Sequence, residues 1–262
     1  MTVTLTFVGT GHAFADGGRA HSCIHVGAPG VSLLLDLGAG AFPALRRTID
    51  VSSIDAVAVS HLHGDHFGGI PFLVLEQHFR HRERPLIVAG PPSLAARLRL
   101  AERAMYPDFF TAPGRPRFEV RQVTLGETPF EIGSASVSAH PVEHIPSAEP
   151  HGLRVRVAGK TIAYSGDARW SEDLAKLAKG AELFICEASN FEHDDPAHIS
   201  YRTLMAHRAE LDCPRIVLTH VGRDVHDRLA EVELEVASDG TVIELESGSG
   251  SSGCAITSSI VS

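Results

Sequence analysis

The sequence has few cysteines, no long apolar run and no excess of positive charge. Its four cysteines, Cys23, Cys186, Cys213 and Cys254, lie far apart and form no CxxC pair. We therefore expect free thiols in a reducing compartment, with no disulfide framework and no cysteine-built metal site. The net charge of −9 argues against a surface that attracts nucleic acid non-specifically, because such surfaces are built from clustered lysine and arginine.

The sequence also lacks membrane and targeting signals. No stretch reaches the length of a membrane span, and residues 1–7 contain no basic segment followed by a long apolar one. We therefore expect a soluble cytoplasmic protein. No linker divides residues 1–246, which we expect to form one domain. Residues 247–262 are rich in serine and glycine and are expected to be a flexible tail, the alternative being a last strand at residues 255–261.

Strand-like and helix-like patterns alternate in both halves of the chain. This alternation predicts an α/β fold in which helices cover the outer faces of two stacked sheets, a four-layer αββα sandwich, with the loops collected at one edge. Strands are expected at residues 3–8, 22–26, 31–35, 54–60, 86–89, 118–123, 136–139, 153–157, 161–165, 183–187 and 216–219. Helices are expected at residues 44–48, 72–79, 94–105, 171–179 and 201–210.

The densest cluster of chemically competent side chains is His61-Leu62-His63-Gly64-Asp65-His66, which follows an apolar strand. Imidazole nitrogen and carboxylate oxygen together suit a borderline divalent ion such as zinc, and four ligands this close can serve two ions. A polar turn with hydrogen-bonded histidines is the alternative. Three imidazoles would repel one another once protonated, so a bound cation is the better explanation.

Three further candidates follow later strands: His144, Asp167 and His220. Taken singly, His140 competes with His144, and Asp167 could be a turn aspartate that bonds its own backbone. Taken together with the first cluster, they complete a two-metal set.

These motifs resemble the metallo-β-lactamase superfamily, whose HxHxDH signature matches His61, His63, Asp65 and His66, with His144, Asp167 and His220 as the later ligands. The segments Phe7-Val8-Gly9-Thr10-Gly11, Tyr164-Ser165-Gly166-Asp167 and Val217-Leu218-Thr219-His220 look most like the ribonuclease Z-like branch. The order of the motifs covers nearly the whole chain.

The resemblance implies a metal-dependent hydrolase. One ion would be held by His61, His63 and His144, a second by Asp65, His66 and His220, and Asp167 would bridge both. A hydroxide between the ions would be the nucleophile, and Asp65 would also accept a hydrogen bond from that water. Zinc is the expected metal, although manganese and iron also occupy sites of this kind.

The resemblance also suggests a proton donor. Glu187 and His198 resemble the acidic residue and histidine that protonate the leaving oxygen in ribonuclease Z-like enzymes, so both are expected to be catalytic. The alternative is structural, with His198 capping the following helix and Glu187 ending a strand at the surface.

One departure from the ribonuclease Z pattern bears on the substrate. Little sequence separates His144 from Tyr164, where ribonuclease Z carries a long arm that grips transfer RNA. Transfer RNA is therefore not expected, and a small phosphodiester is the favoured substrate, the family's small-substrate relatives including cyclic phosphodiesterases. A lactonase, thioesterase or β-lactamase using the same site is the nearest alternative, and a non-catalytic metal-dependent binding or sensing protein is an alternative of another class.

One loop and one helix have no assigned role at this point. His12, Asp16 and Arg19 lie in a glycine-rich loop after the first strand, which could reach the metal edge and contact substrate. Ribonuclease Z-like proteins are often homodimers, and by analogy the apolar helix at residues 72–79 could contribute a contact between two copies.

Overall fold

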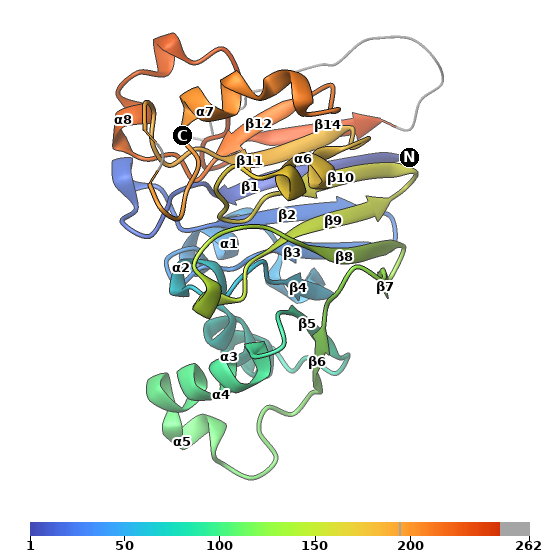
Figure 1. Cartoon of the computed structure of the whole chain (residues 1–262). Coiled ribbons are helices and arrows are strands. Elements are labelled where there is room, and N and C mark those ends of the chain that lie inside the picture. Colours follow the sequence, from blue (N-terminus) through green and yellow to red (C-terminus); the bar gives the residue numbers. More distant parts are fainter. Residues whose placement is uncertain (194, 247–262) are drawn as a thin grey trace.

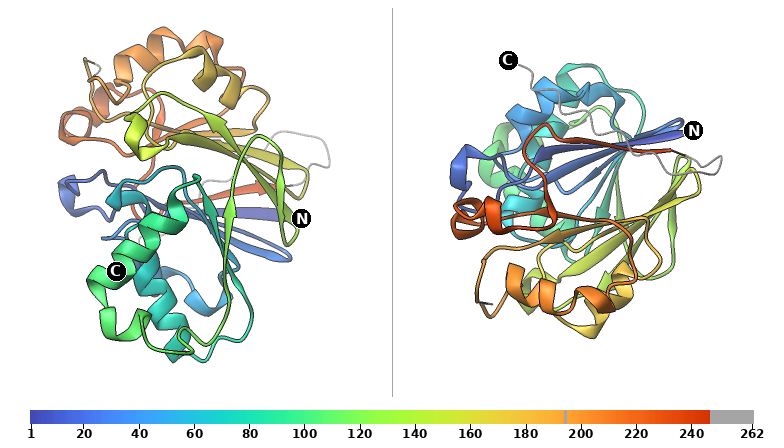
Figure 2. Two further views of the ribbon diagram at one scale, coloured as in Figure 1. Left: turned by 60° about the horizontal axis from the view of Figure 1, so that its bottom comes forward. Right: turned by 90° about the horizontal axis from the view of Figure 1, so that it is seen from above.

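Two seven-stranded sheets face each other, and helices cover their outer faces (Figures 1 and 2). This arrangement is seen in a computed structural model that describes residues 1–193 and 195–246. The strand orders are β14-β1-β2-β3-β4-β5-β6 and β13-β12-β11-β10-β9-β8-β7. The predicted αββα sandwich is therefore confirmed. The proposed tail at residues 247–262 lies outside the described residues.

The first sheet is antiparallel from β14 to β3 and parallel from β3 to β6. Its strands are β1 (Thr2–Gly9), β2 (Cys23–Ala28), β3 (Val31–Leu35), β4 (Ala56–Ala58), β5 (Leu86–Gly90), β6 (Val120–Thr124) and β14 (Val242–Glu246). Its helices are α1 (Phe42–Thr48), α2 (Gly64–Phe67), α3 (Ile70–Phe79), α4 (Leu94–Met105) and α5 (Pro107–Phe110).

The second sheet is antiparallel from β7 to β10 and parallel from β10 to β13. Its strands are β7 (Phe130–Ile132), β8 (Ala135–Pro141), β9 (His151–Val157), β10 (Lys160–Tyr164), β11 (Leu183–Glu187), β12 (Ile216–Thr219) and β13 (Glu235–Val236). The helices α6 (Glu172–Ala178), α7 (Tyr201–Ala206) and α8 (Arg223–His226) follow its strands, and short 3-10 helices occur at η1 (Asp16–Gly18), η2 (Val51–Ser53), η3 (Pro146–Ala148), η4 (Arg208–Glu210) and η5 (Leu229–Glu231).

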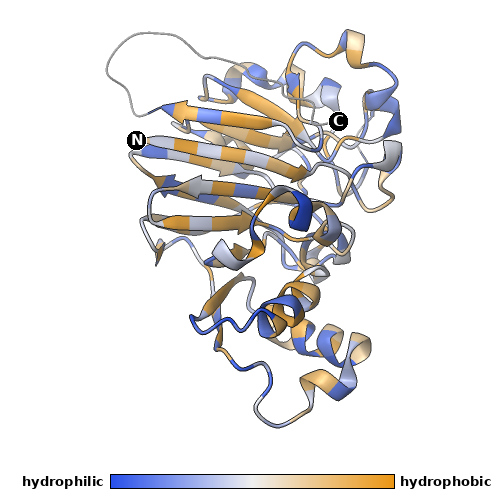
Figure 3. Cartoon of the chain, turned by 180° about the vertical axis from the view of Figure 1, so that it is seen from behind, coloured by the Kyte–Doolittle hydropathy of each residue, from blue (hydrophilic) through white to orange (hydrophobic). Residues whose placement is uncertain are grey.

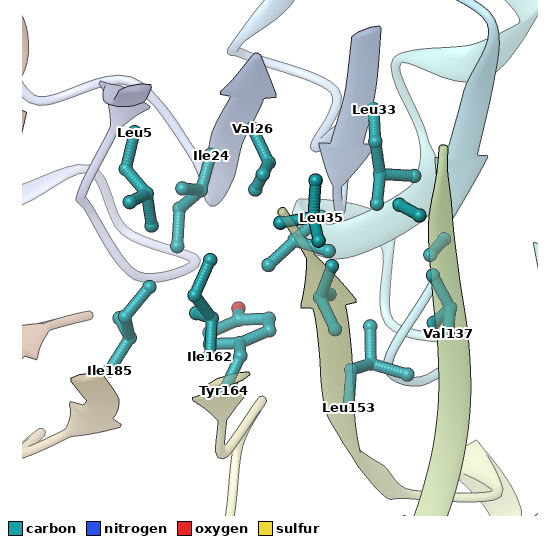
Figure 4. Packing of buried hydrophobic residues seen from close by; sticks show 14 of the residues in the cluster. Leu5, Ile24, Val26, Leu33, Leu35, Val137, Leu153, Ile162, Tyr164 and Ile185 are labelled. Atoms are coloured by element: carbon teal, nitrogen blue, oxygen red, sulfur yellow. The ribbon is translucent and has the colours of Figure 1, made fainter. Parts of the chain in front are cut away.

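The main core lies between the two sheets, where alternate side chains of facing strands meet. Figure 4 shows Leu5, Ile24 and Leu35 of the first sheet directed towards Ile162 and Leu153 of the second. Two further apolar clusters lie between each sheet and its helices. The central strands are therefore apolar on both faces, and the strands visible in Figure 3 carry broad orange bands between paler and blue ones.

Differences from the predicted elements concentrate at the sheet edges. The strands β7, β13 and β14 were not predicted, and β14 extends the first sheet by pairing with β1, Thr4 opposite Glu244. The helix expected at residues 201–210 ends at Ala206 and is followed by η4. Most of α3 is buried, with Phe79 exposed at its end, so a dimer contact through this helix stays a prediction.

The described part of the chain contains no helix that is both long enough and apolar enough to span a membrane. Its three cysteines, Cys23, Cys186 and Cys213, are buried free thiols.

Candidate dinuclear metal site

Four predicted ligands meet in a first cluster at one edge of the sandwich. Nε2 of His61 lies 3.1 Å from Nδ1 of His63, and Nε2 of His144 lies 3.2 Å from that same atom. Oδ2 of Asp167 lies 3.5 Å from Nε2 of His61 and 3.9 Å from Nε2 of His144. These four ligand atoms all lie within 4.8 Å of one another, and they come from both sheets.

A second cluster adjoins the first and shares Asp167 with it. Oδ1 of Asp167 lies 3.2 Å from Nε2 of His66 and 3.3 Å from Nε2 of His220. Oδ2 of Asp65 lies 3.5 Å from each of the same two nitrogens. One carboxylate therefore faces both clusters, with one oxygen towards each.

The donor atoms fit a pair of divalent ions. Nε2 of His66, Oδ1 of Asp167 and Nε2 of His220 are buried and make no hydrogen bond, although buried polar atoms normally find a partner. Two nitrogens bound to one tetrahedral zinc ion lie about 3.3 Å apart at Zn–N distances of roughly 2.0–2.1 Å. The spacings in the first cluster match that value.

The charges of the site also favour a cation. Burial lowers the pKa of His66, but Asp167 and Asp36 outweigh it and hold this pKa well above its ordinary value. A positive charge is thus stabilised at this place, and a divalent ion would provide the charge in place of a proton. At His61, burial and the neighbouring His66 lower the pKa, which keeps the ring in the neutral form that binds metals.

Local structure explains how the first motif presents its side chains. His63 has extended backbone and is the residue before α2, so Asp65 and His66 lie in the first turn of that helix. The amide of Leu62 donates to the carbonyl of Ala148, which ties the motif to η3. A Cβ on Gly38 would lie 2.1 Å from the carbonyl oxygen of Asp65, so only glycine lets the loop after β3 approach α2 this closely.

The later ligands are held at strand ends. His220 directly follows β12 with a left-handed backbone (φ 54°), which is uncommon for a residue with a Cβ, and its amide donates to the carbonyl of Thr10. Nδ1 of His144 lies 2.7 Å from the carbonyl oxygen of Ala197. A carbonyl only accepts, so Nδ1 carries the proton and the lone pair of Nε2 faces the first cluster.

His140, which competed with His144 for the role of ligand, lies away from the two clusters. His140 lies on β8, where its Nε2 pairs with Oγ of Ser138 at 2.9 Å, and it belongs to neither cluster. Asp167 is buried with both carboxylate oxygens facing imidazoles, which does not fit a turn aspartate that bonds its own backbone. The structure thus brings together His144 and Asp167 with the HxHxDH residues.

Asp36 is a site residue that the sequence interpretation missed. It is fully buried and accepts hydrogen bonds from the amide of Ser60 at 2.7 Å, the hydroxyl of Ser60 at 2.8 Å and the hydroxyl of Tyr164 at 2.8 Å. Its Oδ2 lies 2.7 Å from Nδ1 of His66, which directs Nε2 of that ring to the second cluster. The available signal was an aspartate directly after a predominantly apolar strand.

Glu187 and His198 form a pair beside the clusters. Glu187 is fully buried at the end of β11, where it accepts from the amide of Ala168 at 2.6 Å and the hydroxyl of Ser189 at 2.7 Å. Nδ1 of His198 lies 2.8 Å from Oε1 of Glu187 and 4.0 Å from Oδ2 of Asp167. Burial lowers the pKa of His198, but the hydrogen bond and charge of Glu187 outweigh it and raise this pKa to about 9.

The structural alternative for this pair holds only in that Glu187 ends a strand. Glu187 is not at the surface, and Ser200 is the residue whose side chain caps α7, accepting from the amide of Thr203 at 3.2 Å. His198 instead stacks on the ring of His220, with centroids 5.7 Å apart.

Residues 3–238 match the family described as Anti-Pycsar protein Apyc1. The chain belongs to this family. Among relatives of this Apyc1-family chain, an uncharacterised protein of Mycobacterium leprae is 32% identical, over 82% of this chain and 76% of the relative. Ribonuclease Z of Methanothermobacter thermautotrophicus is 29% identical, over 89% of this chain and 90% of that enzyme.

Solved structures share the fold. Human tRNase Z, short form, is 24% identical with a TM-score of 0.72, covering 92% of this chain and 98% of that one. The metallo-β-lactamase fold protein YhfI of Bacillus subtilis is 21% identical with a TM-score of 0.73, covering 93% of this chain and 99% of that one. The Apyc1-family chain therefore has a metallo-β-lactamase fold of the ribonuclease Z-like branch, as predicted, and its His/Asp clusters indicate divalent metal binding.

The loop before η1 reaches this site, as the sequence suggested. The ring of His12 contacts that of His220, with centroids 5.9 Å apart, and its Nε2 lies 3.0 Å from Oδ2 of Asp16. Arg19 is buried in the same loop, and this burial lowers the pKa of its guanidinium, an effect that the nearby Asp239 offsets only in part. His12 is thus a neighbour of the second cluster.

Proposed function

We propose that this protein is a dinuclear metallohydrolase that cleaves a small phosphodiester, with zinc as its metal. His61, His63 and His144 would hold one ion, Asp65, His66 and His220 the second, and Asp167 would bridge them. The observation that carries this proposal is the carboxylate of Asp167, which presents one oxygen to each of two buried clusters.

The chain's own groups would orient the reactants and move the proton. Two divalent ions, when bound, lower the pKa of water and stabilise negative charge on the attacked phosphoryl group. Asp65 accepts a hydrogen bond from the attacking water. His198, held through Nδ1 by the buried Glu187, presents its other nitrogen and protonates the departing oxygen.

The substrate is assigned from the surroundings of His144. A cavity of about 570 Å³ beside this residue is lined in part by Val142, Pro146 and Pro150, and Arg169 stands on its wall. Arg169 is two residues beyond Asp167, and its Nη2 lies 2.5 Å from Oε2 of Glu143. We assign Arg169 to a phosphate oxygen of the substrate, which it would reach by exchanging one carboxylate partner for another anion.

We infer the size of the substrate from the segment between His144 and Asp167 and from the neighbouring cavity. Between His144 and Asp167 the structure has η3, the hairpin of β9 and β10, and no long basic arm. The cavity beside His144 has the volume of a small-molecule site. Its proline walls also suit the second candidate function, hydrolysis of an apolar ester or lactone at the same centre.

One preparation tests these assignments. Metal content is measured together with turnover of bis(p-nitrophenyl) phosphate and p-nitrophenyl acetate, in the wild type and in His63→Ala. About two metals per chain, with phosphodiester cleavage that the substitution abolishes, is the expected result. Metals with ester cleavage alone would transfer the assignment to acyl hydrolysis, and metals without either activity would favour a binding or sensing protein.

Arg169 separates the two hydrolytic functions. Arg169→Ala should raise KM for the phosphodiester and leave KM for the neutral ester unchanged, because only the first carries a charged oxygen. Arg223→Ala, which removes an exposed arginine from α8, is the matched control. Equal effects of Arg169→Ala on both substrates would contradict the phosphate contact.

A further inference from the structure

A large aromatic side chain stands in solvent beside the metal clusters. Phe14 is 85% exposed and lies in the loop between β1 and β2, two residues after His12. Apart from its edge-to-face contact with His12, so exposed a phenyl ring adds little apolar burial to the fold. The exposed face of the ring is therefore available for contact with a ligand.

The loop holds this ring in place by short-range hydrogen bonds. The amide of Phe14 donates to Nδ1 of His12 at 3.1 Å, so the proton of that ring is on Nε2, which donates to Asp16. The amide of Ala15 donates to the carbonyl of His12 at 2.9 Å, and Ala15 turns the chain with a left-handed backbone (φ 53°). Phe14 is thus the tip of a compact, internally bonded loop.

A row of ring contacts connects Phe14 to the reaction centre. The ring of Phe14 meets that of His12 edge to face, with centroids 5.4 Å apart. The ring of His12 contacts His220 in the same manner, and His220 stacks on His198. Phe14 is therefore separated from the cluster ligand His220 by one buried ring, and from the acid His198 by two.

We propose that Phe14 is a specificity-determining residue that packs against a planar aromatic group of the substrate. This inference rests on the proposed phosphodiesterase function. In the proposed function His198 stands beside the leaving oxygen, and we assign Phe14, which lies further out in the row of rings, to the group that remains on phosphorus. Edge-to-face or offset stacking gives such a contact its preference for aromatic over aliphatic groups.

Two substrates that differ only in the retained group test the contact. Phenyl p-nitrophenyl phosphate and methyl p-nitrophenyl phosphate release the same chromophore, so chemistry and detection are matched. Phe14→Ala should raise KM for the phenyl compound about fivefold, leave KM for the methyl compound unchanged, and leave kcat for both near the wild-type value. Phe14→Trp should keep the preference, and Phe14→Leu should lose most of it.

Phe79→Ala is the matched control. Phe79 is 64% exposed at the end of α3, where its ring contacts Phe109 and belongs to a different part of the surface. It should change neither KM. Turnover of both compounds with no selective effect of Phe14→Ala would overturn this inference alone, and so would equal effects on both compounds. Absence of turnover in the metal-loaded wild type would overturn the proposed function and this inference with it.

Discussion

Oδ2 of Asp36 lies 2.7 Å from Nδ1 of His66 at the centre of a buried hydrogen-bond network. Tyr164 donates to the same oxygen from the opposite sheet. The network holds one ring orientation of His66 and joins the two sheets behind the second cluster. A ligand histidine oriented in this way loses no rotational freedom when it binds an ion.

Asp36→Asn should therefore weaken metal binding at the second cluster by about 10–100-fold. The substitution keeps the shape of the side chain and removes the charge that fixes the tautomer of His66. Competitive zinc titration measures the two affinities. Asp108→Asn, at an exposed position of α5, is the control. Unchanged zinc affinities in Asp36→Asn would show that the network does not support a metal ligand.

His198→Ala should lower kcat by about 10²–10⁴ while both metals are retained, because it removes the proton donor and no proposed ligand. Steady-state turnover and metal content of the same sample are the measurements. His207→Ala is a close control, because Nδ1 of His207 also lies 2.7 Å from a carboxylate, that of Glu210, but at the protein surface. An unaltered kcat would remove His198 from the mechanism.

Metal removal should destabilise the fold. Without a cation, the carboxylates of Asp65 and Asp167 share a buried site in which Oδ1 of Asp167 and Nε2 of His66 and of His220 make no hydrogen bond. Free zinc at about 1000-fold over its Kd should stabilise the protein by about 4 kcal/mol, which raises Tm by about 10 °C in a protein of this size. Thermal unfolding with chelator and after repletion tests this, and equal Tm values would argue against a resident metal.

His25 should make stability fall in acid. Burial lowers the pKa of His25 to about 4, against an ordinary 6.5, so the folded protein holds this ring neutral. The stability that the neutral His25 ring contributes to the fold is complete above pH 6.5. It is lost as the pH falls towards 4, because the unfolded chain binds the proton first. The difference in unfolding free energy between wild type and His25→Gln should shrink by up to about 3 kcal/mol from pH 7.5 to pH 4.

Denaturant unfolding at several pH values provides that comparison, with chelator present throughout so that metal loss does not contribute. His226→Gln, at an exposed residue of α8, should show no such trend. A difference between wild type and His25→Gln that stays constant with pH would mean that the ring is not desolvated as the fold suggests.

Central strands were predictable, and three of the four edge strands, β7, β13 and β14, were not. The observed bounds of β3, β11 and β12 are those expected, because a strand buried on both faces must be a continuous apolar run. β14 is half exposed and alternates over only five residues, Val242–Glu246. Its stability comes from pairing with β1 at the other end of the chain, which no local pattern reports.

By itself, the sequence determined the chemistry of the site. The spacing of His61, His63, Asp65 and His66 places four donors around one short helix turn, whatever surrounds them. The nature of these donors already selects a borderline divalent ion. Strand-end positions were enough to nominate His144, Asp167 and His220, because the ends of parallel strands meet at one edge of a sheet.

Only the tertiary structure decided which side chains support that chemistry. Asp36 and Tyr164 are 128 positions apart and meet because two sheets stack in one register. His140 lies within β8, opposite Gly152 of β9 and hydrogen-bonded to Ser138 of its own strand, whereas His144 lies beyond the end of β8 and joins the first cluster. Such contacts depend on how the layers pack, and packing is a property of the whole chain.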